Sequence, residues 1–212
     1  MAVEVPVLPA DDPAALRAAI EAIRSGGLVG LPTETVYGVA CALTDQAIDR
    51  LLEAKRRPAS KGITLLVDSL AQVEPLAGLP ASARALADRF WPGPLTLVLP
   101  VLPAAGLPDS LTGGQGTVGV RMPDHPAPRA IARELGPLPL TSANLSGEPD
   151  ATTPFDVLRQ LGGTLALVLD GGRSPGGVPS TVVACLTDDR APQVLRAGAL
   201  AAEVILAAVG RQ

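Results

Sequence analysis

Hydrophobic and polar residues recur along the chain with the period of helices in some segments and of buried strands in others. The first helix is predicted to begin at Pro13, after a cap at Asp11 or Asp12, because the apolar residues beyond it lie three and four positions apart. A pair of glycines ends this helix. The apolar run 27–31 that follows predicts a buried strand.

The remaining pattern predicts a second helix and then a series of strands and helices. The second helix runs from a Thr44 cap to about Arg56, because Pro58 prevents its continuation. Further strands are predicted at 62–67, 95–101, 117–122, 138–140, 165–170 and 180–186, and further helices near 69–77, 81–90, 125–135, 154–161 and 200–209. This alternation predicts an α/β fold with a mixed, largely buried sheet covered by helices. Because no internal repeat or low-complexity segment interrupts it, we expect a single domain over residues 1–212.

Residues 90–108 form a stretch of 19 residues without a charge, which is long enough to cross a membrane as a helix. Five prolines and two glycines within it exclude a helix in lipid. We therefore predict a turn at 91–94 followed by a buried strand.

Composition restricts the class of protein. Apolar residues make up 47% of the chain and aromatic residues 2%, which predicts a globular protein with an aliphatic core. The net charge of −4 gives no general attraction to nucleic acid, so any binding of phosphate must be local. Cys41 and Cys185 lie in or beside apolar runs without metal-site spacing, which predicts buried thiols in a reducing compartment. The N-terminus has no basic, apolar leader, so we expect the cytoplasm.

Lys55 continues the apolar stripe of the second helix, so we expect its side chain to leave the core at an edge. Two interpretations of this basic segment are open. Cations at a helix C-terminus stabilise its carbonyls by about 0.3–1 kcal/mol. Alternatively, Lys55 and Arg57, with Lys61 as a third charge, bind one anion such as a polyphosphate.

Two clusters of small polar residues each follow an apolar strand: "PTETVYG" at 32–38 and "TSANLSG" at 141–147. Ligands of α/β proteins bind beyond the carboxyl ends of strands, so we expect both clusters to face one crevice. The alternative is that each cluster is a turn that satisfies its own backbone.

Three other segments carry candidate chemistry. The glycine-rich stretch 170–183 places Ser180 at the start of a strand, and only Ser180 is taken from it as a candidate. His125, the single histidine, lies at a predicted helix start with no assignable partner. Residues 114–119 fit G-x-G-x-x-G, but a strand rather than a helix follows, which excludes a dinucleotide site.

Taken together, these motifs resemble the YrdC-like family of L-threonylcarbamoyladenylate synthases over most of the chain. The segments that carry the resemblance are "PTETVYGV", "AKRRPASKGITLLV", "WPGPLTLVL", "VGVRMPDHP", "TSANLSG", "PSTVV" and "LRAG". The family signature K-x-R with S-x-N is met by Lys55, Arg57, Ser142 and Asn144. The resemblance implies an open, twisted mixed sheet with flanking helices around a concave cavity.

The same resemblance implies an activity. L-threonine and bicarbonate give N-carboxythreonine, which attacks the α-phosphorus of ATP and yields threonylcarbamoyl-AMP and pyrophosphate. By motif, threonine would be bound by Thr33, Arg121 and Ser180, and the nucleotide by Lys55, Arg57, Thr117, Ser142, Asn144 and Arg196, with Lys55 and Arg57 as the catalytic pair. Tyr37 is a further candidate in this cavity.

The implied cofactor is Mg²⁺ carried by ATP, with no metal held by the protein alone. The implied partners are downstream proteins that transfer the threonylcarbamoyl group to tRNA; a weak contact with tRNA stays open, and no membrane is involved. Because the chain ends one helix after "LRAG", we expect it to lack the extra C-terminal domain of long family members. The alternatives are a paralogue of this fold with another ligand, an RNA-binding module, and a carbamoyl-transfer domain of a hydrogenase-maturation protein.

Overall fold

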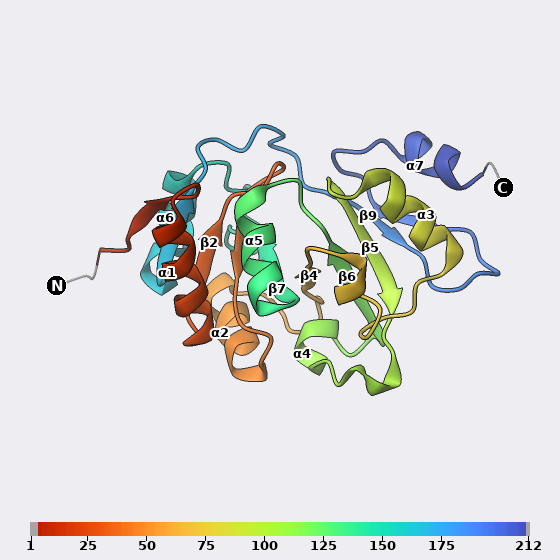
Figure 1. Ribbon diagram of the computed structural model, residues 1–212, viewed down its shortest axis with the longest axis horizontal. Coiled ribbons are helices and arrows are strands. Elements are labelled where there is room, and N and C mark those ends of the chain that lie inside the picture. Colours follow the sequence, from red (N-terminus) through yellow and green to blue (C-terminus); the bar gives the residue numbers. More distant parts are fainter. Residues whose placement is uncertain (1–3, 211–212) are drawn as a thin grey trace.

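The computed structural model describes residues 4–210, which build one mixed sheet with helices on both faces (Figure 1). The strands are β1 (Val7–Pro9), β2 (Val29–Leu31), β3 (Gly38–Ala40), β4 (Thr64–Leu66), β5 (Leu95–Pro100), β6 (Thr117–Arg121), β7 (Leu138–Ser142), β8 (Leu167–Asp170), β9 (Thr181–Ala184) and β10 (Gln193–Arg196). The helices are α1 (Pro13–Arg24), α2 (Asp45–Lys55), α3 (Ala81–Phe90), α4 (Asp109–Thr112), α5 (Pro126–Leu135), α6 (Pro154–Leu161) and α7 (Ala202–Val209).

The first two helices form where the sequence predicts them, because their caps form. The Asp12 side chain accepts a hydrogen bond from the backbone N–H two residues later, and the Thr44 side chain accepts one from three residues later. Helix α2 ends at Lys55, because Arg56 adopts a left-handed backbone with φ of 52°. This turn separates the directions of Lys55 and Arg57.

The sheet has the order β1-β8-β2-β3-β7-β4-β6-β5-β9-β10. Strands β3 and β7 lie near its centre and are antiparallel to their neighbours, whereas β8 pairs in parallel with β1 and β2, β4 with β6, and β5 with β9. The sheet is therefore mixed, as predicted. The polar loop after β2 and the polar end of β7 meet because β3 pairs with both strands.

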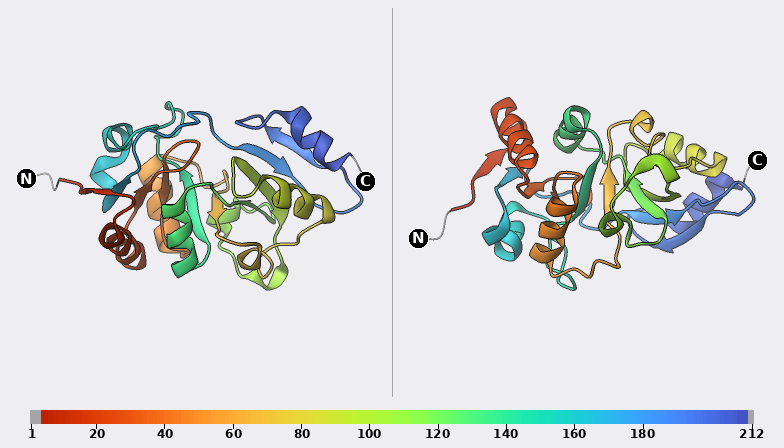
Figure 2. Two further views of the ribbon diagram at one scale, coloured as in Figure 1. Left: turned by 45° about the horizontal axis from the view of Figure 1, so that its top comes forward. Right: turned by 90° about the horizontal axis from the view of Figure 1, so that it is seen from below.

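Both faces of the sheet are buried. Helices α1 and α5 pack on one face with a smaller aliphatic core, and α2 and α6 lie on the other face within a larger core (Figure 2). Leu65 and Leu66, adjacent on β4, enter different cores, as strand alternation requires. Helices α3 and α7 pack against each other near the β9–β10 end of the sheet.

Some elements differ from the predicted ones. The segment 69–77 contains only a short 3₁₀ turn at Leu70–Gln72, so the helix predicted there is wrong. Strands β1, β3 and β10 and the single turn of α4 were not predicted, because three or four residues are too few to show a period. Strand β7 extends beyond the predicted "LPL" to Ser142, which brings its polar end into the sheet.

Residues 90–108 behave as predicted, since a turn with a cis Trp91–Pro92 bond leads into β5. Within residues 4–210, no helix has both the length and the apolar character that a membrane crossing requires. Cys41 and Cys185 are both buried and free, as the sequence predicts.

Candidate functional site

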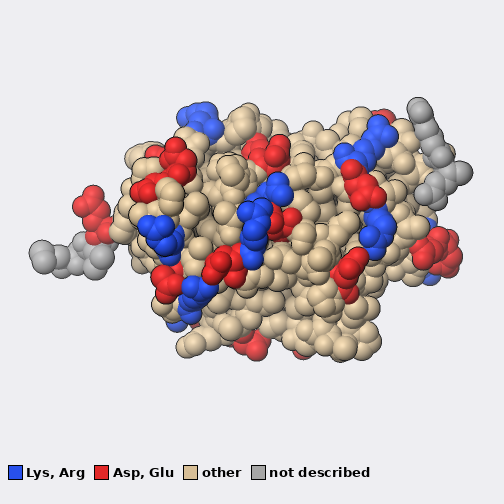
Figure 3. Space-filling model, in the orientation of Figure 1, with Lys and Arg blue, Asp and Glu red and all other residues tan. Residues whose placement is uncertain are grey.

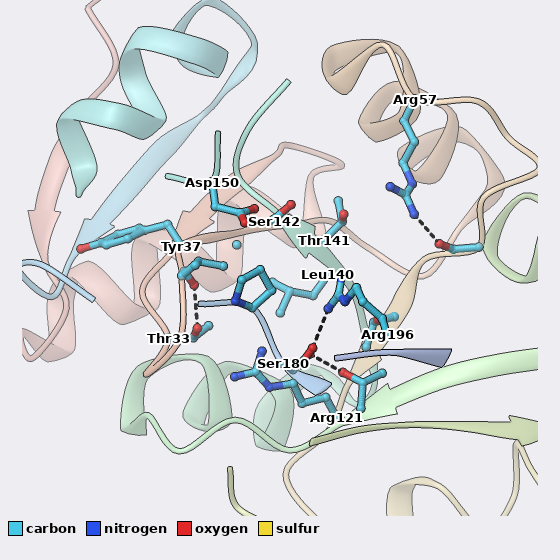
Figure 4. A pocket seen from close by; sticks show the side chains of 16 residues that line it. Thr33, Tyr37, Arg57, Arg121, Leu140, Thr141, Ser142, Asp150, Ser180 and Arg196 are labelled. Atoms are coloured by element: carbon cyan, nitrogen blue, oxygen red, sulfur yellow. Dashed lines mark hydrogen bonds between the residues drawn. The ribbon is translucent and has the colours of Figure 1, made fainter. Parts of the chain in front are cut away.

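A cavity of about 190 Å³ opens where the β2–β3 loop, the end of β7 and the start of β9 meet (Figure 4). Six of the predicted site residues lie in its wall: Thr33, Arg57, Arg121, Ser142, Ser180 and Arg196. The expectation that the two polar clusters face one crevice is therefore confirmed. Tyr37 also lines this cavity.

One end of the cavity is formed by Arg121 and hydroxyl groups. Arg121 lies at the end of β6, is buried, and donates from Nη2 to Glu34 Oε1 at 2.6 Å and to Thr35 Oγ1 at 2.9 Å. Ser180 Oγ lies 2.7 Å from Thr96 Oγ1, so the two hydroxyls share a hydrogen bond. This end combines a fixed guanidinium with small hydroxyls, which suits a carboxylate and an alcohol.

The Thr33 hydroxyl is held by its own loop. Thr33 Oγ1 donates to Val36 O at 2.6 Å and lies 3.0 Å from Thr35 Oγ1. The alternative that this cluster satisfies its own backbone is thus correct in part, since the same hydroxyl also lies in the cavity wall. Both conditions hold because a hydroxyl has one donor and two acceptor sites.

Arg57 and Arg196 add two further cations to the cavity wall, and Arg196 lies beside Ser180 (Figure 4). Arg57 donates from Nη2 to Gly62 O at 2.8 Å, and Arg196 donates from Nη2 to Ser180 O at 2.7 Å. Burial, and then the positive charge of Arg196, lowers the pKa of Arg57. Cations crowded in this way favour binding of an anion, because the anion relieves their mutual repulsion.

Lys55 does not leave the core at an edge, and that expectation is wrong. Its side chain is 2% exposed, and its Nζ donates to the backbone carbonyls of Ser142 and Asn144. Because these two acceptors lie at the end of β7 and in the loop after it, they draw the ammonium inward. Lys55 thus holds this loop from behind the cavity wall, and its direct contact with a nucleotide stays a prediction.

Asn144 also acts within the loop. Its Oδ1 accepts from Ser142 Oγ at 2.5 Å, and its Nδ2 donates to Leu145 O at 3.0 Å and Glu148 O at 2.7 Å. Asn144 is buried and is absent from the cavity wall, which includes Ser142. The predicted contact of Asn144 with a nucleotide therefore remains a prediction, whereas its role in shaping the loop is shown.

Lys55 lies in the last turn of α2, as the helix-capping interpretation requires, but neither cation caps the carbonyls of this helix. Lys55 reaches carbonyls of the β7 loop, and Arg57 reaches the carbonyls of Lys61 and Gly62 in its own loop. Neither side chain bonds to a carbonyl of α2; the backbone N–H groups of Arg56 and Arg57 donate to Glu53 O and Leu52 O instead.

Thr117 and His125 lie away from the cavity wall. Thr117 shares its face of β6 with Arg121 by alternation, but it stands at the other end of the five-residue strand. His125 caps α5, since its Nδ1 accepts from Ala127 N at 3.2 Å, and burial lowers its pKa. The predicted helix start at 125 is confirmed.

Sequence reasoning assigned no site role to Thr64, Thr96 and Asp150, which also line the cavity. The two threonines had a signal: each is a polar residue within an apolar strand. Asp150 had none, because it lies in the irregular segment between β7 and α6. Within residues 4–210, no group of three or more histidine, cysteine or acidic residues could hold a metal.

The chain matches the Sua5/YciO/YrdC family model, described as telomere recombination, over residues 21–198. The chain belongs to this family. Its predicted fold is confirmed by the structures of family members. The crystal structure of P. abyssi Sua5 complexed with L-threonine matches with a TM-score of 0.90 at 39% identity, and the match covers 97% of this chain and 61% of that chain. The structure of E. coli YciO has a TM-score of 0.80 at 27% identity, with 92% and 95% covered.

Curated relatives carry the name threonylcarbamoyl-AMP synthase. The protein of Bacillus subtilis (strain 168) is 42% identical over 206 residues, which cover 96% of this chain and 58% of the relative. The protein of Pyrococcus abyssi is 44% identical over 198 residues, with 92% and 57% covered. The chain thus spans less than two thirds of these two relatives. The protein of Vibrio cholerae is 39% identical over 188 residues and is covered over 97% of its length.

Proposed function

We propose that this protein makes threonylcarbamoyl-AMP from L-threonine, bicarbonate and ATP, for the threonylcarbamoyladenosine modification of tRNA. The observation that carries the proposal is a single cavity whose wall holds Arg121 and Ser180, which suit a carboxylate, and two further cations, Arg57 and Arg196, which suit phosphate. The names of the curated relatives and the threonine complex of the P. abyssi protein support it.

The reaction has two steps, and the cavity residues suit each of them. The threonine amine adds to bicarbonate with loss of water, which gives N-carboxythreonine. An oxygen of the new carboxylate on its nitrogen then attacks the α-phosphorus of ATP while pyrophosphate leaves. Arg121, Ser180 and Thr33 hold threonine so that its amine faces the nucleotide. Arg57 and Arg196 stabilise negative charge on the phosphates, and such positioning plus electrostatic stabilisation accounts for most of the acceleration in phosphoryl-type transfers.

The size of the cavity determines how much of each substrate it can enclose. At about 190 Å³ it is smaller than the ~300 Å³ at which sites for drug-sized ligands begin, so threonine fits inside whereas the nucleotide extends through its mouth. Lys55 and Asn144 take part by fixing the loop that presents Ser142. Thr117 contacts the nucleotide only if the latter reaches along β6.

Mg²⁺ enters as part of the substrate Mg·ATP. Magnesium in such sites is held by substrate phosphates, water and one or two carboxylates. The cavity fits this requirement, because Asp150 supplies one carboxylate in its wall. When bound, the ion neutralises charge on the phosphates of ATP.

We further propose that downstream proteins, which transfer the threonylcarbamoyl group to tRNA, consume the product, and that the protein works in the cytoplasm. An RNA-binding module would instead need a broad basic surface. On the face shown in Figure 3, basic and acidic side chains are interspersed.

The deciding assay is release of pyrophosphate from ATP with threonine and bicarbonate omitted in turn. We expect release only when both are present, because together they form the nucleophile. Release that ignores threonine would indicate another acceptor or simple hydrolysis of ATP, as would fit a paralogue with a different ligand. No release under any condition would also contradict the proposal.

A further inference from the structure

The hydrogen bonds of Arg121 leave one part of its guanidinium free. Its Nε donates to Gly93 O at 3.3 Å, and its Nη2 donates to Glu34 and Thr35. Among the described residues Nη1 has no such partner, while Arg121 lines the cavity beside Ser180 (Figure 4). Two N–H groups on one nitrogen are therefore available to a ligand, in an orientation that Glu34 and Thr35 fix.

Glu34 distinguishes Arg121 from the other cavity arginines. Among the ion pairs of residues 4–210, only the Arg121–Glu34 pair involves an arginine of the cavity wall. Arg57 and Arg196 bind backbone carbonyls instead. The cavity wall thus has one guanidinium that a carboxylate balances, at Arg121, and two, at Arg57 and Arg196, that form no ion pair among the described residues.

Glu34 is held in place at a cost. Its Oε1 accepts the 2.6 Å bond from Arg121, but its Oε2 is buried and has no hydrogen-bond partner among the described residues. Its backbone oxygen accepts from Gly176 N at 3.0 Å, which ties it to the glycine-rich loop. A buried carboxylate oxygen without a partner destabilises a fold, so packing alone does not explain a charged residue here.

The balanced pair favours a zwitterion over a polyanion. A free amino acid carries an ammonium as well as a carboxylate, so repulsion of its carboxylate by Glu34 is offset by attraction of its ammonium. Pyrophosphate and the ATP phosphates carry several negative charges and no positive one, so each added charge increases the repulsion. Discrimination between ligands by such a repulsive element is common in specific sites.

From this geometry we infer that Glu34 is a specificity-determining residue: it reserves Arg121 for the carboxylate of an amino acid and leaves polyphosphate to Arg57 and Arg196. The inference rests on the proposed function, in which threonine lies inside the cavity and the phosphates of ATP bind beside it. Without Glu34, three cationic side chains would compete for the same phosphates.

The test is calorimetric binding of threonine without ATP, at rising concentrations of inorganic pyrophosphate. In the unmodified protein we expect the apparent Kd for threonine to level off, because the two ligands bind different arginines. In Glu34→Gln, which keeps an acceptor for Arg121 but removes the charge, we expect simple competition: the apparent Kd rises in proportion to pyrophosphate and exceeds the unmodified value by at least about tenfold.

Asp68→Asn is the matched control. Asp68 is also a largely buried carboxylate paired with arginines, Arg129 and Arg133, but it lies outside the cavity wall. We expect this variant to keep the plateau even where it loses stability. Glu34→Asp, which keeps the charge, should restore most of the plateau.

The outcomes separate the inference from the proposed function. Absence of threonine binding in the unmodified protein would contradict the proposed function, and the inference with it. Threonine binding with the same pyrophosphate dependence in Glu34→Gln and the unmodified protein would overturn the inference alone. Should Glu34→Gln fail to fold, a second test uses a threonine analogue with the unmodified protein. In 1-amino-2-hydroxypropylphosphonate a more highly charged phosphonate replaces the carboxylate, so we expect it to bind at least about tenfold more weakly than threonine. Equal or tighter binding would refute the inference.

Discussion

Lys55 places an ammonium group in the core, where its protonation is linked to stability. Burial above all, and then the charge of Arg57, lowers the pKa of Lys55 to about 8, while Asp150 opposes the shift. In the unfolded chain the lysine keeps its ordinary pKa near 10.5, so between these values the unfolded state binds more protons. The lysine therefore adds stability as the pH rises through this window.

We predict that the free energy of unfolding of the native protein, relative to Lys55→Met, increases by about 3 kcal/mol between pH 7 and pH 10.5. Urea unfolding at both pH values measures it. The comparison of the two proteins cancels the contributions of other groups to the pH dependence, such as that of Cys41, whose pKa burial raises to about 12. A difference that is constant with pH would mean that Lys55 stays charged in the folded state throughout.

At the residue scale, the sequence indicated which residues form the site better than it indicated which way their side chains point. The motifs identified six residues that the fold brings to one cavity, because polar residues at the ends of neighbouring strands meet at one edge of the sheet. The inward turn of Lys55 was not predictable, since its acceptors lie 87 and 89 residues away along the chain. The Glu34–Arg121 pair was equally invisible, because two long side chains meet across a loop and a strand.

At the scale of elements, long periodic segments were predictable and short strands were not. Helices α1, α2, α5 and α6 follow their caps and apolar stripes. Strand β3 has three residues and exists because β2 and β7 pair with it, so its signal lies in its neighbours rather than in its own sequence. The polar loop directly before β3 made the strand still harder to predict.

The glycine-rich loop between β8 and β9 is fixed by the single tyrosine of the chain. Tyr37 OH donates to Gly172 O at 2.7 Å and accepts from Gly171 N at 3.1 Å. In Tyr37→Phe we expect faster amide exchange at 174, 176 and 177, whose N–H groups bond to neighbouring loops, with a stability loss of about 1–2 kcal/mol. Hydrogen exchange measured residue by residue checks this.

Thr164→Val serves as the control for that loop. It removes one hydroxyl hydrogen bond, to Leu161 O at 2.8 Å, in the turn after α6. We expect it to leave protection of the glycine-rich loop unchanged. If Tyr37→Phe lowered protection equally in α1 and in the loop, the hydroxyl would stabilise the whole fold and would not act as a local anchor.

At the scale of the whole molecule, the cavity joins the two halves of the sheet. Its wall takes Thr33 and Ser142 from the β2–β3–β7 half and Arg121, Ser180 and Arg196 from the β6–β10 half. Ligands that fill it should therefore stabilise the folded chain as a unit. The α/β class and the mixed sheet were predictable from the alternation of periods, whereas the strand order was not, because it depends on pairings between distant segments.

We predict that threonine with α,β-methylene-ATP and Mg²⁺, which block turnover, raise the Tm of the native protein by roughly 5–10 °C at about 100 times Kd, from a stabilisation of about 2.7 kcal/mol. In Arg57→Ala the Tm without ligand should change little, because the side chain only bonds to two carbonyls of its own loop. The nucleotide-dependent shift should be lost. Arg159→Ala, an exposed arginine on α6, should keep the full shift. A large fall in Tm for Arg57→Ala without ligand, with the shift retained, would make Arg57 a structural residue and remove it from the nucleotide site.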